Sequence, residues 1–377
     1  MSLKVCIAAN ALGYPQGGGH LWTYLNWALG FRALGCEVIW LELINPSDST
    51  ERIAANVAAM KGRLARYGLA DKLALASHCG AVVAEELRVG CLDLDAAAES
   101  DLLLNFCYGA NPVIVNRFRT SALLDIDPGP LQLWISQRSI EVASHDHYLS
   151  IGETVGKPDA RFPDCGLRWR YTPPCVALDW WPVRRASLDA CFTTITHWTA
   201  DEWIEGPEGW VANDKRTGFS DFLDLPLHSA HKFERALILG HDEQEERLAL
   251  MHRGWHIQNA HEVAGSPWDY QHYIQRSLGE FSCAKPSYVR FQTAWVSDRT
   301  LCYLASGKPV VAQNTGPSEF LPDGAGLFRF RTIKEATNAL SQVTADYETH
   351  ARPARALAAE FFDARKVAAK LLEQTLT

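Results

Sequence analysis

The sequence lacks long hydrophobic runs, an excess of basic residues and closely paired cysteines. No apolar stretch reaches the ~18 residues that a membrane-spanning helix needs, and the apolar run at 1–9 is too short for a secretion signal. Acidic residues outnumber basic ones by 44 to 36, and the net charge of −8 argues against a nucleic-acid partner. The ten cysteines form no CxxC pair, as is usual for reduced thiols. These absences predict a soluble, cytoplasmic protein.

The chain is long enough for two domains. It has 377 residues, 47% of them hydrophobic, and a domain typically takes ~150 residues. Strand-like apolar runs alternate with helical patterns on both sides of a break at 171–182, whose three prolines cannot lie inside a helix or central strand. The alternation predicts parallel, doubly wound sheets. We therefore expect an α/β protein with Rossmann-like domains at 1–182 and 183–350 and a helix at 351–377.

The segment 297–312 carries the most chemical information. Ser297 is a good N-cap for a helix over 297–306, which Gly307 ends, and Pro309 prevents its continuation. The start of such a helix offers unpaired N–H groups and a partial positive charge to an anion. Arg299 and Thr300, in its first turn, add donors suited to a phosphate. The alternative is an ordinary capped helix that enters a strand.

The following residues, 307–328, read Gly-Lys-Pro-Val-Val-Ala, then Thr-Gly-Pro-Ser-Glu, then Pro-Asp-Gly-Ala-Gly-Leu-Phe. This run resembles the donor-binding half of GT-B glycosyltransferases, in which A-x-G-x-P-V-V-A, G-G-x-x-E and D-G-x-x-G-L follow one another. The resemblance implies the GT-B architecture, two Rossmann-like domains facing a central cleft. Domain 1–182 would bind the acceptor, domain 183–350 would bind a nucleotide sugar, and the helix at 351–377 would pack back on the first domain.

The resemblance also implies an activity. A glycosyltransferase of this kind moves a hexosyl group from a nucleoside-diphosphate sugar to the hydroxyl or other nucleophile of a small-molecule or glycan acceptor. It needs no metal ion and no cofactor besides the nucleotide sugar as co-substrate. Two alternatives stay open: a non-catalytic regulatory or partner protein with the same fold, and a nucleotide-sugar epimerase or hydrolase.

Site residues follow from the same resemblance. Gly316 would let the backbone approach the donor, Glu319 would bind its hydroxyls, and Glu262 would meet the nucleoside. Lys285 would neutralise the leaving diphosphate, unless it is an ordinary surface lysine. The expected donor-binding residues are Gly17, Gly18, Gly19, Glu262, Lys285, Ser297, Arg299, Thr300, Gly316 and Glu319.

The chain departs from the pattern at one important point. Retaining members carry two acidic residues seven positions apart before the glycine, but Ala294 and Cys302 stand nearest to those positions here. Asp298, one helical turn earlier, is a candidate substitute and therefore a candidate catalytic residue beside Lys285. Retaining and inverting chemistry both remain possible.

The glycine run 17–19 lies between the first expected strand and helix, where glycines allow close backbone approach. In GT-B proteins this loop touches donor or acceptor. His20 follows directly and is the candidate general base of an inverting reaction, because histidine titrates near neutral pH. The alternative is a histidine that packs or binds phosphate. A distorted dinucleotide fingerprint ending at Glu42 is disfavoured, because G-x-G-x-x-G is absent.

Two further polar clusters follow strand-like runs. Asp125 and Asp127 are placed to orient an acceptor, with Asp127 the candidate contact, although Asp-Pro-Gly is also ordinary turn chemistry. The run His145-Asp146-His147 resembles a metal site, but neighbouring residues on a strand point to opposite faces. We therefore expect no metal ion there.

Overall fold

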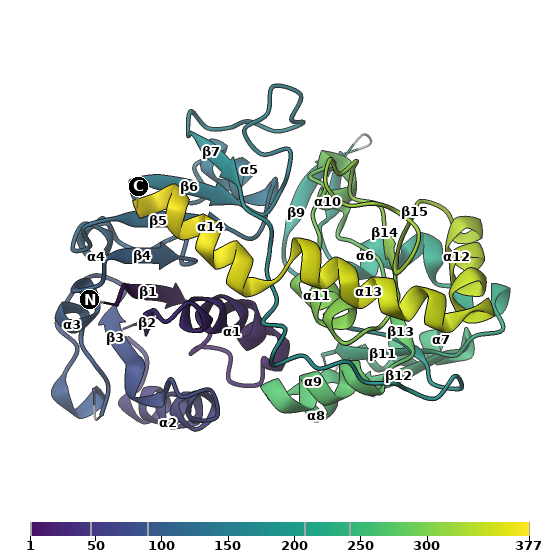
Figure 1. The fold of residues 1–377 in the computed structure, drawn as a ribbon, viewed down its shortest axis with the longest axis horizontal. Coiled ribbons are helices and arrows are strands. Elements are labelled where there is room, and N and C mark those ends of the chain that lie inside the picture. Colours follow the sequence, from purple (N-terminus) through teal and green to yellow (C-terminus); the bar gives the residue numbers. More distant parts are fainter. Residues whose placement is uncertain (1, 46, 89, 207–208, 241–242, 377) are drawn as a thin grey trace. The chain divides into compact units, whose positions relative to one another are not determined.

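A computed structural model of the chain describes residues 2–45, 47–88, 90–206, 209–240 and 243–376. The chain divides into two compact units, Met1–Ala177 with Asp363–Thr377 as unit 1 and Leu178–Phe362 as unit 2 (Figure 1). The chain therefore passes from one unit to the other twice. The first passage lies within the proline-rich break, five residues before the expected boundary at 182.

Unit 1 is built on a seven-stranded sheet in the order β3-β2-β1-β4-β5-β6-β7, in which every neighbouring pair is parallel. Its strands are β1 Lys4–Ala9, β2 Glu37–Ile44, β3 Leu73–Ser77, β4 Leu102–Asn105, β5 Ser121–Asp125, β6 His147–Ser150 and β7 Trp169–Tyr171. Its helices are α1 Gly18–Ala33, α2 Thr50–Ala65, α3 Leu94–Ala98, α4 Pro112–Val115, α5 Pro130–Ser136 and α14 Ala364–Leu376, with 3-10 turns at Ala70–Lys72 and Glu85–Leu87. The strand order reverses direction at β1 and β4, and doubly wound sheets bind ligands beside such a reversal.

Unit 2 repeats the plan with a six-stranded parallel sheet, β12-β11-β8-β13-β14-β15, and a separate hairpin of β9 and β10. The strands are β8 Phe192–His197, β9 Trp203–Gly206, β10 Gly209–Ala212, β11 Phe233–Ile238, β12 Trp255–Asn259, β13 Gly279–Ser282, β14 Val310–Gln313 and β15 Leu327–Phe330. The helices are α6 Lys215–Phe219, α7 Gln244–His252, α8 Ala260–Ala264, α9 Pro267–Arg276, α10 Pro286–Phe291, α11 Asp298–Ala305, α12 Ile333–Ala345 and α13 Tyr347–Phe361. Two 3-10 turns lie at Ser220–Phe222 and Leu225–His228.

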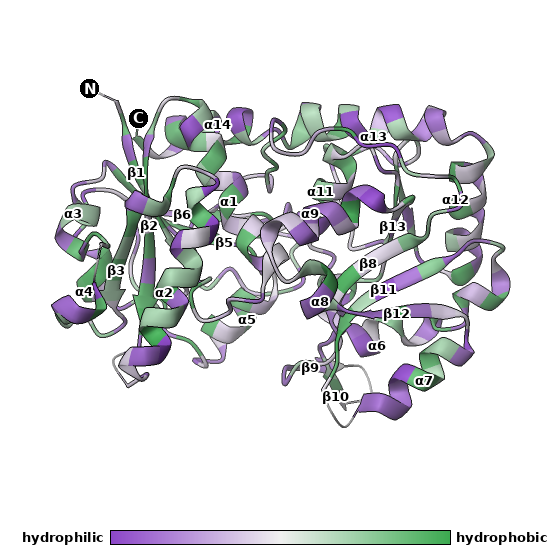
Figure 2. Ribbon diagram, turned by 90° about the horizontal axis from the view of Figure 1, so that it is seen from below, coloured by the Kyte–Doolittle hydropathy of each residue, from purple (hydrophilic) through white to green (hydrophobic). Residues whose placement is uncertain are grey.

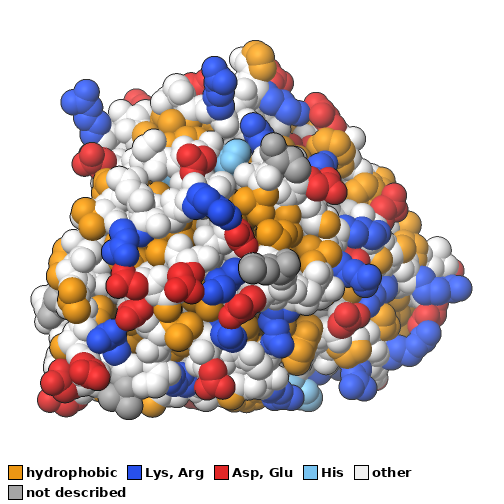
Figure 3. All heavy atoms as spheres, turned by 60° about the vertical axis from the view of Figure 1, so that its left-hand side comes forward, with side chains coloured by type: hydrophobic (Ala, Val, Ile, Leu, Met, Phe, Trp, Pro, Cys, Tyr) orange, Lys and Arg blue, Asp and Glu red, His pale blue; other side chains and the backbone are white. Residues whose placement is uncertain are grey.

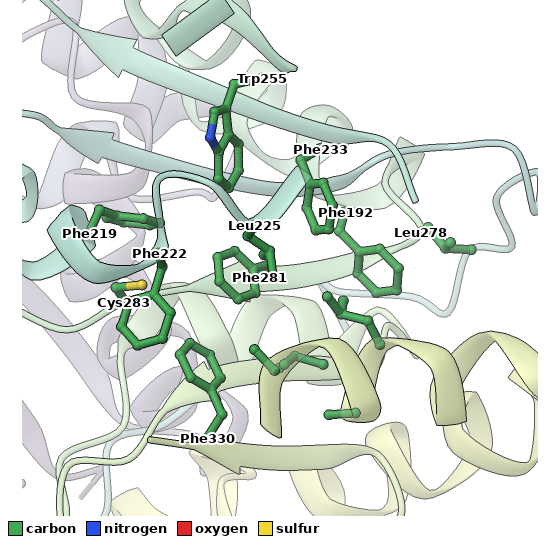
Figure 4. Packing of buried hydrophobic residues seen from close by; sticks show 14 of the residues in the cluster. Phe192, Phe219, Phe222, Leu225, Phe233, Trp255, Leu278, Phe281, Cys283 and Phe330 are labelled. Carbon is green, nitrogen blue, oxygen red and sulfur yellow. The ribbon is translucent and has the colours of Figure 1, made fainter. Parts of the chain in front are cut away.

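Aromatic side chains dominate the core of unit 2 (Figure 4). Phe281 on β13 stacks on Phe330 of β15, with ring centroids 5.2 Å apart and planes 10° apart. Phe233 of β11 and Trp255 of β12 also pack against Phe281. Colouring by hydropathy shows that strands such as β3 are largely hydrophobic, whereas helices such as α7 carry both hydrophobic and hydrophilic residues (Figure 2). Buried strands beneath amphipathic helices are the α/β fold class that the sequence predicts.

The chain's last helical stretch differs from the expectation. The sequence predicts one helix over 351–377 that belongs with the first domain. The structure instead has two helices, and α13 belongs to unit 2 while α14 belongs to unit 1. Phe362, which is buried and has non-helical backbone angles (φ −127°, ψ 7°), interrupts the helix between them. In unit 1 α14 packs on α1 so closely that a Cβ on Gly30 would lie 2.6 Å from the carbonyl oxygen of Ala364.

The described helices and the cysteines bear on two expectations about the whole chain. None of the described helices has the length and hydrophobicity that crossing a bilayer requires. All ten cysteines lie in described parts of the chain, and each is a free thiol. Burial raises the pKa of the Cys283 thiol to about 12, which keeps it protonated and unreactive.

Candidate functional site

A cavity opens in unit 2 at the carboxyl ends of β13 and β14, the edge at which parallel sheets bind ligands. Its lining combines the residues after these strands with the start of α11: Lys215, Ser282, Cys283, Ala284, Ala294, Trp295, Val296, Ser297, Arg299, Thr300, Ala312, Gln313, Thr315, Leu327 and Arg329. The space is small, ≈ 30 Å³, and partly open to solvent. A ligand bound here would place only one small group inside, and the remainder would extend outside.

The start of α11 lines this cavity, and its N-cap is the residue that the sequence predicts. Ser297 is the N-cap, and its side chain accepts a hydrogen bond from the backbone N–H of Arg299. The helix ends at Ala305, and Gly307 follows with a φ of +70°, a conformation that a glycine adopts without strain. The N-terminal N–H groups and the helix dipole make this end of the cavity attractive to an anion.

The side chains of Arg299 and Thr300 are held differently from the expectation. Both donate to the carboxylate of Glu280, which is fully buried on β13: Arg299 Nε lies 2.7 Å from Oε1 and Thr300 Oγ1 lies 2.7 Å from Oε2. Arg299 Nη1 donates in addition to the carbonyl of Ile195, at 2.8 Å. Both residues line the cavity, but their donors are largely committed to the fold. Sequence reasoning missed Glu280 because it lies within an apolar strand.

Lys215 is the cation that sequence reasoning missed. It begins α6, is 8% exposed, and lines the cavity while its ammonium donates to the carbonyl of Cys283 at 2.5 Å. Burial, followed by the nearby positive charge of Arg299, lowers the pKa of Lys215 to about 7. A bound anion would reverse that shift. The hairpin of β9 and β10 separates Lys215 from its strand β8, so no strand-to-helix spacing indicated it.

Lys285 lies beside the cavity without lining it. It is the N-cap residue of α10, and its ammonium pairs with Glu202 at 2.8 Å. Glu202 also accepts a hydrogen bond from Asn213 Nδ2 at 2.6 Å. The half-buried ion pair shows that Lys285 is not simply a solvated surface lysine. Its charge already has a partner in this conformation.

Three expected donor contacts lie outside the cavity lining. Gly316 has a φ of +129°, and a Cβ there would meet the carbonyl oxygen of Gln292 at 2.6 Å. A glycine is therefore required at position 316 by the packing of this loop, whether or not a ligand binds. Glu319 is exposed further along that loop. Glu262 is exposed on α8, after β12, and accepts a hydrogen bond from Asn259 at 3.1 Å.

The positions that depart from the family pattern are buried. Ala294 lines the cavity with a φ of +55°, and its N–H donates to the carbonyl of Thr315 at 2.9 Å. Cys302 lies inside α11 and is 1% exposed. Asp298 occupies the first position of α11, one residue before Arg299. It is the acidic side chain nearest in sequence to the cavity's anion-attracting end.

In unit 1, His20 lies in the first turn of α1, whose N-cap is Gly17. Its Nε2 is 2.5 Å from the carbonyl oxygen of Asn10, so this nitrogen carries the proton in the neutral ring. The lone pair of Nδ1 is then the basic site. Burial lowers the pKa of His20, against the opposing effects of the Asn10 carbonyl and the Asp127 carboxylate. The imidazole is therefore neutral at physiological pH, as a general base must be.

Asp127 follows β5 at the carboxyl edge of the unit 1 sheet. Its carboxylate accepts a hydrogen bond from the hydroxyl of Tyr108 at 3.0 Å. Asp125, at the end of β5, is fully buried and accepts bonds from Gln132 and Ser150. Burial raises the pKa of Asp125 to about 7. The two aspartates therefore belong to one hydrogen-bonded turn, in which Asp125 is buried and Asp127 is partly exposed.

Other predicted features of unit 1 have structural partners. Glu42 is buried, and its carboxylate accepts hydrogen bonds from the backbone of Ala11 and Leu12 and from Trp40. It holds the loop after β1 and does not present a carboxylate to a ribose. His145 contacts Asn105 and the carbonyl of Ala143, and Asp146 accepts from Ser121. Among the described residues, no three His, Cys, Asp or Glu side chains are grouped as metal ligands.

No protein-family model matches the chain, and no curated protein matches it in sequence. HepE of Anabaena, in complex with UDP and glucose, is 12% identical over 99% of both chains with a TM-score of 0.57. An alpha-glucosyltransferase in complex with UDP and a 13-mer DNA is 10% identical over 99% of both chains, with a TM-score of 0.63. A glycosyltransferase from Rickettsia africae is 9% identical over 99% of this chain and 97% of its own, with a TM-score of 0.53. The chain has the GT-B fold.

The GT-B fold gives the two units their places in the architecture. Unit 2 corresponds to the half that carries the sequence resemblance at 307–328, and it holds the cavity beside α11 and Lys215. Unit 1 corresponds to the other half and carries His20 and Asp127. A fold hosts many chemistries, so the activity must be argued from these side chains.

Proposed function

We propose that this GT-B protein is a glycosyltransferase that moves a hexosyl group from a nucleoside-diphosphate sugar to an acceptor nucleophile. The observation that carries the proposal is the cavity in unit 2, where the N-terminus of α11 and the buried amine of Lys215 meet at the carboxyl edge of the sheet. This combination suits a diphosphate, because helix N–H groups and a lysine ammonium both bind phosphate oxygens.

The chemistry requires such a site. When the bond between the sugar and the diphosphate breaks, the leaving group gains negative charge, and donors positioned to meet that charge lower the barrier. Lys215 and the first-turn N–H groups of α11 would be those donors, and Lys285 would add positive charge beside them. Asp298, the candidate catalytic acid, lies in the same first turn of α11. HepE and the alpha-glucosyltransferase are both in complex with UDP, which makes a uridine nucleotide the first donor to test.

We assign the acceptor to unit 1. His20 Nδ1 would remove the proton from the attacking hydroxyl, and Asp127 and the loop of Gly17, Gly18 and Gly19 would position the acceptor and donor. Experiment must determine the nucleobase and the sugar of the donor, and whether the reaction retains or inverts the anomeric configuration. Turnover in the presence of EDTA would test whether the reaction is independent of a metal ion.

The acceptor we propose is a small molecule or a glycan. The net charge of −8 disfavours a polyanion, and Figure 3 shows a face on which basic and acidic side chains are interspersed. The alpha-glucosyltransferase is in complex with DNA, so nucleic acid belongs among the acceptors tested. A gel-retardation assay at low salt would reveal binding of DNA.

The decisive experiment combines binding with turnover. Calorimetry should show UDP binding that weakens by roughly 10- to 100-fold in Lys215→Met, the scale of a charged hydrogen bond. Lys334→Met, on the exposed face of α12, is the matched control and should bind normally. Release of UDP from UDP-glucose only when an acceptor is added would support transfer. Release without an acceptor would point to a hydrolase, and UDP binding without any turnover would point to a non-catalytic protein.

A further inference from the structure

A second cavity of unit 2 lies at the opposite end of α11 from the first. Its volume is ≈ 180 Å³, somewhat larger than a ~150 Å³ cavity that accommodates benzene. One wall is the segment 183–185, the other is the first half of α13, and Gly307 closes the space between them. Neither the proposed donor site nor the proposed acceptor residues contribute to it.

The charge of this cavity is unusual for the chain. Four arginines line it, Arg184, Arg185, Arg352 and Arg355, against a single acidic residue, Glu348. Three positive charges are therefore uncompensated in the lining, although the protein as a whole carries a net charge of −8. Like charges held around one space repel one another, and an anion placed among them would remove that repulsion.

The four guanidinium groups have different tasks. Arg355 donates to the carbonyls of Trp181, at 2.7 Å, and Ala305, at 2.5 Å, and so holds the two walls together. Arg185 pairs with Glu348 at the solvent-exposed rim, where an ion pair contributes little.

The two remaining arginines are available to a ligand. Within the described parts of the chain, the guanidinium groups of Arg184 and Arg352 form no hydrogen bond or ion pair, and Asp346 influences Arg352 only through its longer-range charge. Lys308, directly after Gly307, buries its ammonium with 0% exposure and no hydrogen-bond partner in the structure as described. Lys308, the neighbour of the lining residue Gly307, therefore adds a fifth positive charge that no acidic side chain pairs with in the described parts of the chain.

We infer that this arginine-lined cavity binds a small phosphate-bearing anion, at a site separate from the donor cavity. Guanidinium groups match the oxygens of phosphate in charge and geometry, and two of them on opposite walls can bind it from both sides. The volume leaves room for a small organic group on the phosphate. The inference stands on the cavity and its arginines, and it does not depend on the proposed transferase activity.

The test is calorimetric titration of the full-length protein with inorganic phosphate, and in a separate arm with glycerol 3-phosphate, both in saturating UDP. Saturable binding of one or both is expected. The double variant Arg184→Gln/Arg352→Gln should lose at least ~10-fold in affinity for the anion. The corresponding double lysine variant should bind with an intermediate affinity, because it keeps the charge and loses the planar fork.

Controls separate this site from the donor cavity. Arg331→Gln removes an exposed arginine of unit 2 outside the cavity and should bind phosphate normally. Lys215→Met should weaken UDP and leave the phosphate titration unchanged. Tighter binding of the monoester would identify an organic phosphate as the ligand class, and equal binding would identify phosphate itself. The inference is overturned if phosphate does not bind saturably, or if the double glutamine variant, with an unchanged melting temperature, binds it as the unaltered protein does.

Discussion

The guanidinium of Arg299 lies 2.7 Å from the carboxylate of Glu280, and Glu280 is fully buried. This pair changes what a substitution of Arg299 measures. Removing one partner of a buried ion pair leaves an uncompensated charge and typically costs about 3–5 kcal/mol. We expect Arg299→Gln to lower the free energy of unfolding by an amount in that range, measured by denaturant titration.

A second substitution isolates the ion pair. Arg299→Gln combined with Glu280→Gln removes both charges and should regain part of the lost stability. If Arg299→Gln instead unfolds like the unaltered protein while UDP binding weakens, Arg299 is a ligand contact and its structural role is minor.

UDP binding should take up a proton. Burial holds the pKa of Lys215 at about 7, so most of the protein has a neutral amine at pH 8. A bound diphosphate stabilises the ammonium and raises that pKa, so affinity should increase as the pH falls from about 8 toward 7. Calorimetry in buffers with different ionisation enthalpies measures the uptake. Lys215→Met should abolish it, and an uptake that survives in this variant would assign the proton to another group.

His20→Gln should leave UDP affinity unchanged and lower kcat by ~100-fold or more, the contribution of a general base. The pH profile offers an independent measurement. Because burial lowers the pKa of His20, the neutral base persists below the usual histidine range. The acidic limb of the kcat/KM profile should therefore have its midpoint below the ~6.5 of an ordinary histidine. A loss of only a few-fold in kcat would assign His20 to packing or positioning.

Gly316→Ala should destabilise unit 2 more than Gly324→Ala does. Both glycines have a positive φ, +129° and +111°, so alanine is strained at either position. At Gly316 the new Cβ also meets the carbonyl oxygen of Gln292 at 2.6 Å, whereas nothing lies within 4 Å of it at Gly324. Melting temperatures of the two variants provide the comparison. Equal shifts would show that the 316 loop yields to the added methyl group.

Local signals in the sequence were sufficient for the fold class and for α11. Alternating apolar runs predicted the strands that form the two parallel sheets, and Ser297 and Gly307 marked the ends of a helix whose observed limits are Asp298–Ala305. These features depend on neighbours in the chain, so periodicity and capping chemistry reveal them. The strands β7, β9, β10 and β15 were not predicted. β7 and β15 lie at the edges of their sheets, and β9 and β10 form a separate hairpin, so none of them has the continuous apolar run of a central strand.

The contacts of the site depend on residues far apart in sequence. Lys215 reaches the carbonyl of Cys283 across 68 positions, and Arg299 reaches Glu280 across 19. Nothing near Glu280 in the sequence indicates a buried carboxylate that competes with a ligand for Arg299 and Thr300. The sequence predicted residues at the carboxyl edge of the sheet. Only the packing shows which of their hydrogen-bond donors already have partners within the protein.

The two passages of the chain between the units affect the order in which the protein can fold during synthesis. Domains generally fold as the chain emerges, beginning at the N-terminus. Unit 1 needs α14, whose Ala364 backbone fills the space left by Gly30 on α1, and α14 is translated after all of unit 2. Unit 2 is continuous in sequence and has all its residues earlier. The unit that begins first on the ribosome is therefore the last one that can be completed.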